Sequence, residues 1–281
     1  MSAYAASRIV ALMSERHDVV GHYESIREEN RISTGIGQLE LVRTQEVLRR
    51  HLPPPPARVL DVGGGTGIHA SWLAARGDSV HVIDLTPRHV EMVREELGGL
   101  GVTAEEGDAR ALNVAADSFD VVLVLGPMYH LTAAEDRQQA LREAVRAVRP
   151  GGLIAVGAIN RFASLFDGLA RGFLFDGDFR KIVERDLAEG QHRNPDNRPH
   201  WFTTAYFHEP EHLRDELKGV DLEVIELVGL EGLAGWLRNL EEKWETDDGR
   251  ESILYAARTI ESTPSLLGLS GHLLAITRAP G

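Results

Sequence analysis

The stretch RVLDVGGGTGIHASWLAARGDSVHVIDL at residues 58–85 decides the fold. It joins a short apolar run of strand character to a glycine-rich turn, an amphipathic helical segment and a second strand-like run that ends at Asp84. Strand, helix and strand in this order indicate parallel pairing through a right-handed crossover. The stretch therefore predicts an open, doubly wound α/β sheet.

The same alternation continues toward the C-terminus. The predicted strands are 58–62, 80–84, 102–106, 120–125, 153–159, 222–227 and 272–278. Two of the helices between them carry start signals: Thr86 is expected as an N-cap before Pro87, and Thr132 with Glu135 has capping-box spacing.

Two segments depart from the alternation. Residues 1–52 carry helical periodicity and are predicted to form an N-terminal helical cap, which the stiff run Pro53–Pro56 separates from a core at 53–281. Residues from about 160 to 208 are rich in Phe and end in a loop-like stretch. They are predicted to be a helical insertion over the carboxyl edge of the sheet.

The composition limits the classes of partner. The 281 residues include 30 Lys or Arg and 43 Asp or Glu, which gives a formal charge of −13. A protein that binds phosphate backbones needs a basic surface, so no nucleic acid is expected as a partner, and no anionic membrane. Hydrophobic residues at 43% and charged residues at 26% are typical of a globular protein.

The chain has no Cys, which removes disulfides, thiolate metal sites and a cysteine nucleophile. Its longest apolar run, 121–128, is far shorter than the roughly 20 residues of a membrane span. Arg8, Glu15 and Arg16 interrupt the region where a signal peptide would be apolar. These features predict a cytoplasmic protein.

Polar and glycine residues gather where the predicted strands end. The turn Asp61–Gly67 can place backbone N–H groups against a ligand at a helix N-terminus. Asp84, about twenty residues further on, can accept hydrogen bonds from both hydroxyls of a ribose, and Asp108 in Gly107-Asp108-Ala109 can accept from an adenine amine. Together these residues outline a site for an adenosine.

A known family combines these motifs. DVGGGTG at 61–67, the acid at 84, GDA at 107–109 and RPGG at 149–152 together resemble the class I S-adenosylmethionine-dependent methyltransferases. The segment LGPMYHL at 125–131 is similar to the small-molecule branch of that superfamily. The resemblance covers about residues 56–160 and is weaker over the last two strands.

The resemblance implies a Rossmann-like, seven-stranded sheet of order 3-2-1-4-5-7-6 with an antiparallel last strand. It also implies S-adenosyl-L-methionine as cofactor and S-adenosyl-L-homocysteine as product. The glycine turn would contact the methionine part of the cofactor, Asp84 the ribose, Asp108 and Ala109 the adenine, and Leu85 the ring. The cofactor contacts expected from these motifs are Asp61, Gly63, Gly64, Gly65, Gly67, Asp84, Leu85, Asp108, Ala109 and Leu125.

Methyl transfer from a sulfonium is an in-line displacement, which mainly requires alignment and exclusion of water. A base is useful when the acceptor is a hydroxyl or a protonated amine, and His suits this role near neutral pH. His130, with Tyr129 beside it, is the catalytic candidate. The alternative is that His130 caps the following helix or holds its loop.

Other residues remain open to two interpretations. Arg31 can pair with the cofactor carboxylate or lie on a solvated helix face, and His69 and His81 are expected to be packing or surface residues. A set of aromatic residues can line a substrate pocket or pack the insertion; it comprises Phe162, Phe166, Phe173, Phe175, Trp201, Phe202, Tyr206 and Phe207.

One motif is rejected. His208-Glu209-Pro210-Glu211-His212 satisfies the H-E-x-x-H zinc pattern, which needs both His residues on one helix face. Pro210 is better suited to the first turn of a helix, with His208 outside it. No metal site is therefore predicted.

The predicted activity is methyl transfer to an oxygen or nitrogen of a small molecule by a monomer or homodimer. A peptide or protein carboxylate, or a tRNA bound through a local basic patch, is an alternative acceptor. GTGIHA at 65–70 can also be interpreted as the G-x-G-x-x-A turn of an NAD(P)-dependent oxidoreductase, and a non-catalytic cofactor-binding module is a third class.

Overall fold

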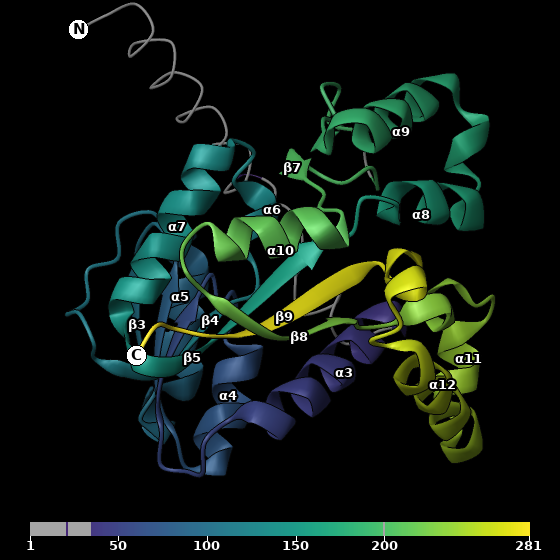
Figure 1. The fold of residues 1–281 in the computed structure, drawn as a ribbon. Helices are drawn as coiled ribbons and strands as arrows, with labels where there is room; N and C mark the ends of the chain where they lie inside the picture. Colours follow the sequence, from purple (N-terminus) through teal and green to yellow (C-terminus); the bar gives the residue numbers. More distant parts are fainter. Residues whose placement is uncertain (1–20, 22–34, 199) are drawn as a thin grey trace, which may run out of the picture.

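The computed structural model describes residue 21 and residues 35–198 and 200–281. Its centre is a seven-stranded sheet of order β3-β2-β1-β4-β5-β9-β8 (Figure 1). The strands of this sheet are β1 (Arg58–Val62), β2 (Ser79–Asp84), β3 (Thr103–Glu106), β4 (Phe119–Val124), β5 (Val148–Ile159), β8 (Glu223–Gly229) and β9 (His272–Arg278).

Strands β1 to β5 pair in parallel, and β9 is antiparallel to both β5 and β8. Counted within the sheet, the order is 3-2-1-4-5-7-6 with the last strand antiparallel, so the predicted fold class is confirmed. The order reverses between β1 and β4, which is where ligands bind in such sheets.

Helices cover both faces of the sheet, and others extend beyond its edge. They are α3 (Gly35–His51), α4 (Ile68–Arg76), α5 (Pro87–Leu97), α6 (Pro127–His130), α7 (Ala134–Ala147), α8 (Ala163–Arg171), α9 (Gly177–Glu189), α10 (Pro210–Lys218), α11 (Leu240–Trp244) and α12 (Asp247–Ile260). Short 3-10 turns lie at η1 (Gly98–Leu100), η2 (Phe173–Phe175), η3 (Gly232–Trp236) and η4 (Pro264–Leu269).

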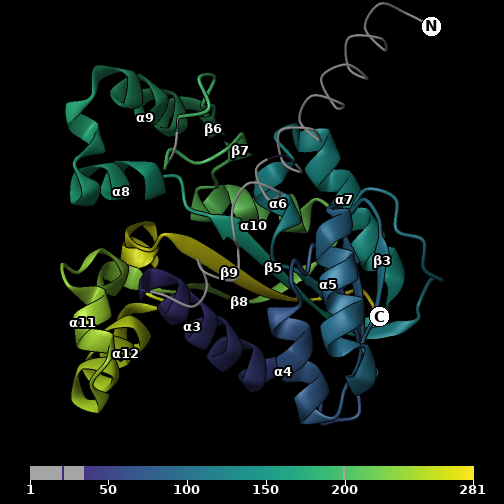
Figure 2. The same ribbon diagram turned by 180° about the vertical axis from the view of Figure 1, so that it is seen from behind.

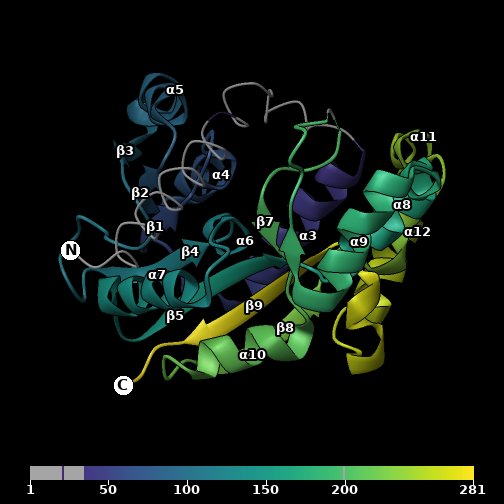
Figure 3. The ribbon, with the colours of Figure 1, turned by 90° about the horizontal axis from the view of Figure 1, so that it is seen from above.

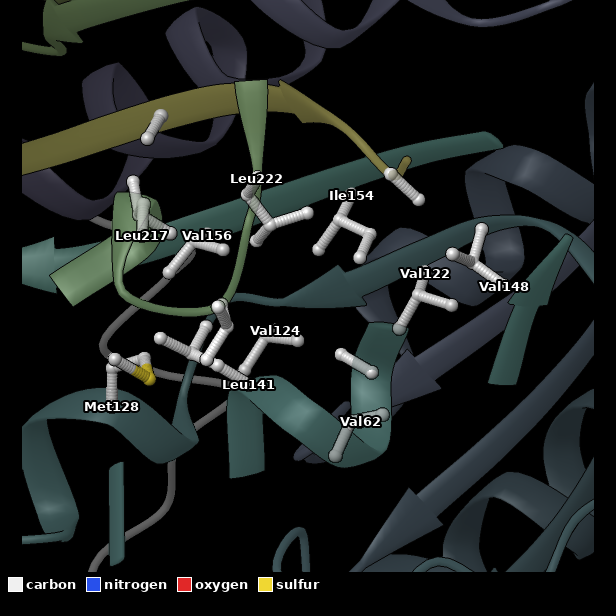
Figure 4. Close-up of a cluster of buried hydrophobic side chains, with 14 of the residues drawn as sticks. Val62, Val122, Val124, Met128, Leu141, Val148, Ile154, Val156, Leu217 and Leu222 are labelled. Carbon is white, nitrogen blue, oxygen red and sulfur yellow. The ribbon is translucent and has the colours of Figure 1, made fainter. Parts of the chain in front are cut away.

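Apolar side chains of the central strands supply a core on each face. On one face, Val122 and Val124 pack with Leu141 of α7 and Leu217 of α10 (Figure 4). On the other face, Val121 and Leu123 of β4 pack with helices α3, α4 and α5. Figure 3 shows these two layers of helices on opposite sides of the sheet. The near-continuous apolar runs of the parallel strands follow from burial on both faces.

Two details of the elements differ from the expectations. β5 begins at Val148, five residues before the predicted strand at 153–159, and so includes the RPGG segment. α7 begins after Ala133, and its N-cap makes no side-chain hydrogen bond within the described chain, so the capping box predicted from Thr132 and Glu135 does not form. The N-cap position of Thr86 before Pro87 is confirmed.

The segment after β5 forms α8, η2, α9 and the two-stranded sheet of β6 (Gln191–His192) and β7 (Ala205–Tyr206). Figures 1 and 2 show α8 and α9 beyond the carboxyl end of β5. This segment has a small core of its own, in which Phe179 packs against Trp201 with ring centroids 5.1 Å apart.

A buried cluster of Arg137, Glu216 and Tyr206 joins this segment to the core. Arg137 of α7 donates hydrogen bonds to Glu216 of α10 and lies 3.6 Å from the ring centroid of Tyr206. Burial opposes ionisation of Glu216, but hydrogen bonds from His208 and Arg137 lower its pKa to about 2. Arg137 also donates to the carbonyls of Leu131 and Thr132, so the same group fixes the loop after α6.

Glu216→Ala is expected to lower the free energy of unfolding by about 3 kcal/mol, because it leaves the buried Arg137 guanidinium without its counter-charge. Urea denaturation at pH 7 measures the change. Glu211→Ala, an exposed position on the same helix, is the control and should shift stability by less than about 0.5 kcal/mol. Equal stability of both variants would show that the Glu216 pair does not stabilise the fold.

α3 packs directly on the sheet, because Val47 and Leu48 belong to the same core as Val59 of β1. Its buried Arg43 pairs with Glu46 and with Glu261, a residue far along the chain. The division into a cap and a core stays a prediction. None of the helices in the described part of the chain has the length and apolar character needed to cross a membrane.

Candidate active site

A cavity lies at the carboxyl ends of the central parallel strands. Its described walls come from α3, the glycine turn, the segments that follow β2 and β3, and the segment from Leu125 to Leu131. These are the segments on either side of the point where the strand order reverses. The topology therefore gathers residues that are far apart in the sequence, from Gly37 to Leu131, around one space.

The glycine turn forms one wall because its backbone adopts conformations that suit glycine. Gly63 and Gly65 have φ of 70° and 56°. A Cβ at Gly63 would lie 2.7 Å from Pro127, whereas a Cβ at Gly65 would meet nothing described within 4 Å and would project into open space. The turn thus leaves room for a ligand directly against the backbone at Gly65.

Gly67 has a different role from the one predicted. It is not among the described residues that line the cavity, and it precedes α4 with φ of 81°. A Cβ there would lie 2.7 Å from Leu97 and 3.0 Å from Val93 of α5. The third glycine of the turn therefore allows close helix packing, and the geometry does not support cofactor contact at this position.

Asp84 holds the turn in place. Its Oδ2 accepts a hydrogen bond from Gly65 N at 2.9 Å, and its Oδ1 accepts from Thr86 N at 2.8 Å and lies 3.2 Å from His89 Nδ1. Burial raises its pKa, but these hydrogen bonds and the nearby His89 outweigh burial and keep the pKa below its usual value. The cavity therefore has an ionised carboxylate beside the glycine turn at neutral pH.

Asp61 is buried at the end of β1, with 1% of its surface exposed. Its Oδ2 has no hydrogen-bond partner among the described residues. Burial, helped by the charge of Asp84, raises the pKa of Asp61 to about 7. A buried acceptor without a partner, in a cavity wall, is suited to a ligand that donates a hydrogen bond or carries positive charge.

Asp61→Asn is expected to change how stability depends on pH. The pKa of Asp61 is about 7 in the fold, above its ordinary value of 3.8. Protonation of Asp61 therefore stabilises the fold fully below about pH 4, and this stabilisation is lost as the pH rises to about 7. The variant should therefore gain melting temperature relative to wild type at pH 8 but not at pH 4.5. The exposed control Asp196→Asn should show no such trend; a pH-independent difference for Asp61→Asn would contradict the shifted pKa.

Asp108 and Ala109 line the cavity after β3, and their contact with an adenine stays a prediction. The Asp108 carboxylate accepts hydrogen bonds from Arg110 Nε at 2.9 Å and Nη2 at 2.6 Å. Arg110 also donates to Asp136 at 3.1 Å, which anchors the segment to α7. No signal in the sequence indicated that this guanidinium would hold the carboxylate.

Tyr129 and His130 lie on α6 and line the cavity on the side facing the insertion. Their rings meet edge to face with centroids 4.6 Å apart, and the His130 ring stacks on Phe202 at 6.1 Å. His130 does not cap the next helix, whose N-cap is Ala133. The alternative of helix capping is therefore excluded, and the catalytic role of His130 stays a prediction.

α3 contributes a wall that the sequence did not predict. Gly37, Glu40, Leu41 and Thr44 line the cavity, and their spacing of i, i+3, i+4 and i+7 is that of one helix face. His69 also lines the cavity, and its expected packing or surface role stays a prediction. The periodicity of α3 was visible in the sequence, but no sequence signal indicated which helix face meets the cavity.

Of the remaining residues predicted to contact the cofactor, some line the cavity and one lies outside the described residues. Gly64, Leu85 and Leu125 line the cavity, whereas Arg31 lies outside the described residues. Of the eight aromatic residues considered for a substrate pocket, none is among the described cavity walls, although Phe202 contacts both His130 and Tyr129. Phe173 and Trp201 pack in the core of the insertion, Phe207 packs with Ile159 and Ala205, and Phe175 is 85% exposed.

Two groups of potential metal ligands are satisfied by contacts within the protein. His208 precedes α10 and contacts Glu216, so the H-E-x-x-H residues do not share a helix face. Glu40, Glu231 and His272 place one potential ligand atom each within 4.8 Å of one another. The buried Glu231 accepts hydrogen bonds from Ser270 and His272, and these bonds account for the second group without an ion.

Similarity to known proteins is concentrated on the strands around this cavity. Residues 59–152, which contain the glycine turn and the strands beside it, match the family model described as a methyltransferase domain. These residues are a methyltransferase domain. The sheet around these residues has the strand order that the resemblance to class I S-adenosylmethionine-dependent methyltransferases implied.

Curated relatives match different shares of the chain. Methyltransferase GfsG of Streptomyces halstedii is 36% identical over 36% of this chain and 37% of its own length. The ubiquinone biosynthesis O-methyltransferase of Azorhizobium caulinodans is 28% identical over 80% of this chain and 82% of its own length. The chain spans less than half the length of the first curated relatives that it matches.

A solved S-adenosylmethionine-dependent methyltransferase from Mesorhizobium loti has the same fold. It superposes with a TM-score of 0.57 at 19% identity, covering 85% of this chain and 99% of that one. The residues present in the methyltransferase domain fit this cofactor. The open space at Gly65 and the Asp61 Oδ2 that lacks a described partner provide room and a polar acceptor beside the glycine turn.

Proposed function

We propose that the protein transfers the methyl group of S-adenosyl-L-methionine to an oxygen or nitrogen of a small molecule. The observation that carries the proposal is that one cavity joins the glycine turn, Asp84 and Asp108 to Tyr129 and His130. The first three outline an adenosine site, and the last two supply groups that can orient and deprotonate an acceptor. The O-methyltransferase relative supports an oxygen acceptor.

In this proposal, Asp84 would accept hydrogen bonds from the ribose, Asp108 and Ala109 would face the adenine, and Gly65 would lie against the methionine part. When bound there, the cofactor supplies an electrophilic methyl group. The walls exclude water and fix the approach of the acceptor, and such alignment can contribute roughly 7 to 11 kcal/mol to lowering the barrier.

His130 would accept the proton of the acceptor hydroxyl or ammonium. Its ring is held between Tyr129 and Phe202, so its orientation is fixed before an acceptor binds. A positioned base of this kind adds about 10² to 10⁴ in rate.

Other functions have less support. An NAD(P)-dependent oxidoreductase would also use the glycine turn and Asp84, but the matched family model is that of a methyltransferase domain. A peptide or protein carboxylate, a tRNA and a non-catalytic role remain the alternatives for this site. A cytoplasmic monomer or homodimer acting on a small molecule is part of the proposal.

The experiment is a screen of candidate phenols, alcohols, amines and carboxylates with methyl-labelled S-adenosylmethionine, followed by mass analysis. We expect labelled product from one chemical class together with S-adenosylhomocysteine. Binding of the cofactor with no transfer to any acceptor would favour the non-catalytic alternative, and oxidation of a substrate with NAD(P) would replace the proposal.

A further inference from the structure

His89 is a polar residue on the buried side of α5, which is otherwise apolar. The buried residues of this helix are His89, Val90, Val93 and Leu97, and only 4% of the surface of His89 is exposed. The apolar residues pack in the core with the strands, whereas His89 lines the cavity. The proposed mechanism assigns His89 no role, so its contacts indicate what it does.

His89 contacts the carboxylate of Asp84. Its Nδ1 lies 3.2 Å from Asp84 Oδ1, and both side chains are more than nine-tenths buried. Because an ionised carboxylate only accepts hydrogen bonds, this contact requires a proton on Nδ1, and the imidazole is the donor. The two side chains therefore meet through a directed hydrogen bond, which is what buried polar groups require.

The start of α5 fixes this geometry within a short stretch of chain. His89 follows Asp84 by five residues, and the helix begins between them. The N-cap Thr86 links the two residues, because its N donates to Asp84 Oδ1 at 2.8 Å and its carbonyl accepts from His89 N at 3.0 Å. The direction of the imidazole relative to the carboxylate is therefore set by the first turn of the helix.

His89 supplies the side-chain contact that supports Asp84. The other donors are the backbone N–H groups of Gly65, in the glycine turn, and of Thr86. Burial raises the pKa of Asp84, and the hydrogen bond from His89 comes first among the contacts that lower it. A donor on a packed helix thus both orients the carboxylate and favours its ionised form.

We propose that His89 is a positioning residue that acts through Asp84 and holds its carboxylate in the direction in which it receives the hydroxyls of a sugar. The class of ligand is a ribonucleoside with free 2′ and 3′ hydroxyls. The inference deepens the proposed function and rests on it for the nucleoside. His89 acts in this way on the affinity for the nucleoside and takes no part in the transfer of the methyl group.

Calorimetry on the full chain at pH 7.5 tests the proposal with two ligands, S-adenosylhomocysteine and its 2′,3′-dideoxy analogue. The Kd of the analogue divided by the Kd of S-adenosylhomocysteine, the hydroxyl ratio, measures what the sugar hydroxyls contribute. His89→Phe keeps an aromatic ring and removes the donor, whereas His89→Asn places an amide N–H near the position of Nδ1. His89→Leu carries the test if His89→Phe lowers the melting temperature.

Val90→Ala is the matched control, because Val90 is the next residue of α5. Val90 is 2% exposed, packs in the core and has no polar atom in its side chain that could bond to Asp84. The variant should lower the melting temperature and leave the hydroxyl ratio at its wild-type value.

In His89→Phe we expect S-adenosylhomocysteine to bind about tenfold more weakly, which corresponds to about 1.4 kcal/mol, and the dideoxy analogue to bind within about twofold of wild type. The hydroxyl ratio should therefore fall about tenfold, and His89→Asn should recover most of it. A role in packing alone would weaken both ligands together and leave the ratio unchanged.

A wild-type hydroxyl ratio in both His89→Phe and His89→Leu would overturn the positioning role. A ratio in His89→Asn as low as in His89→Phe would assign the effect to the shape of the ring, and would also overturn it. Failure of the wild-type protein to bind S-adenosylhomocysteine would instead overturn the proposed function. Equal binding of both ligands by wild type would remove Asp84 from the ribose and, with it, the role of His89.

Discussion

His130→Gln is expected to lower kcat by about 10² to 10⁴ while the Kd for S-adenosylhomocysteine stays within about twofold. The reason is that Gln keeps much of the packing between Tyr129 and Phe202 but cannot take a proton at neutral pH. Steady-state rates with the acceptor found by the labelling screen, and calorimetry with S-adenosylhomocysteine, measure the two quantities separately. The rate of the variant should also lose the rise with pH that a titrating base produces in wild type.

His81→Gln is the matched control, because His81 lies on β2 with its Nδ1 2.8 Å from Thr103 and is not among the described cavity walls. It should leave kcat within about twofold. A His130→Gln enzyme with wild-type kcat and an unchanged pH profile would end the role of His130 as base. The acceptor would then lose its proton to another group or to water.

Asp84→Asn should weaken binding of S-adenosylhomocysteine by about 10² to 10⁴, since two charge-assisted hydrogen bonds to a ribose contribute about 1.5–3 kcal/mol each. The substitution also leaves one amide oxygen to serve two backbone donors, Gly65 N and Thr86 N, so the glycine turn loses part of its support. Calorimetry at pH 7.5 measures the affinity.

The control is Asp78→Asn, a buried carboxylate at the other end of β2 that accepts from Ala57 N at 2.9 Å. It should lower stability without changing the Kd of the nucleoside by more than about threefold. Equal losses of affinity in Asp84→Asn and Asp78→Asn would show that Asp84 acts on the fold rather than on the ribose.

Much of the fold was predictable because its signals are local. The runs at 58–62 and 272–278 become β1 and β9 without change, and Pro210 starts α10 as expected. Errors arose where tertiary pairing overrides local signals. β5 starts five residues before the predicted strand because Val148 pairs with Phe119 of β4, and residues 149–152 form the irregularity between this pair and Leu153↔Val121.

The site was predictable where it depends on strand ends and unpredictable where it depends on helix faces. Asp84 ends β2 and Asp108 follows β3, so the sheet topology alone brings them to the cavity. Glu40 and His69 reach it through the packing of α3 and α4, which the sequence does not specify. Gly67 shows the converse, because a motif glycine turns out to serve packing against α5.

The most direct test of the central claim, that this cavity binds an adenosyl sulfonium cofactor, is calorimetric titration of the wild-type protein with S-adenosylhomocysteine, run in parallel with NAD⁺. We expect saturable binding of one S-adenosylhomocysteine per chain and no measurable heat from NAD⁺. Binding of NAD⁺ with none of S-adenosylhomocysteine would contradict the proposed cofactor and, with it, the proposed reaction.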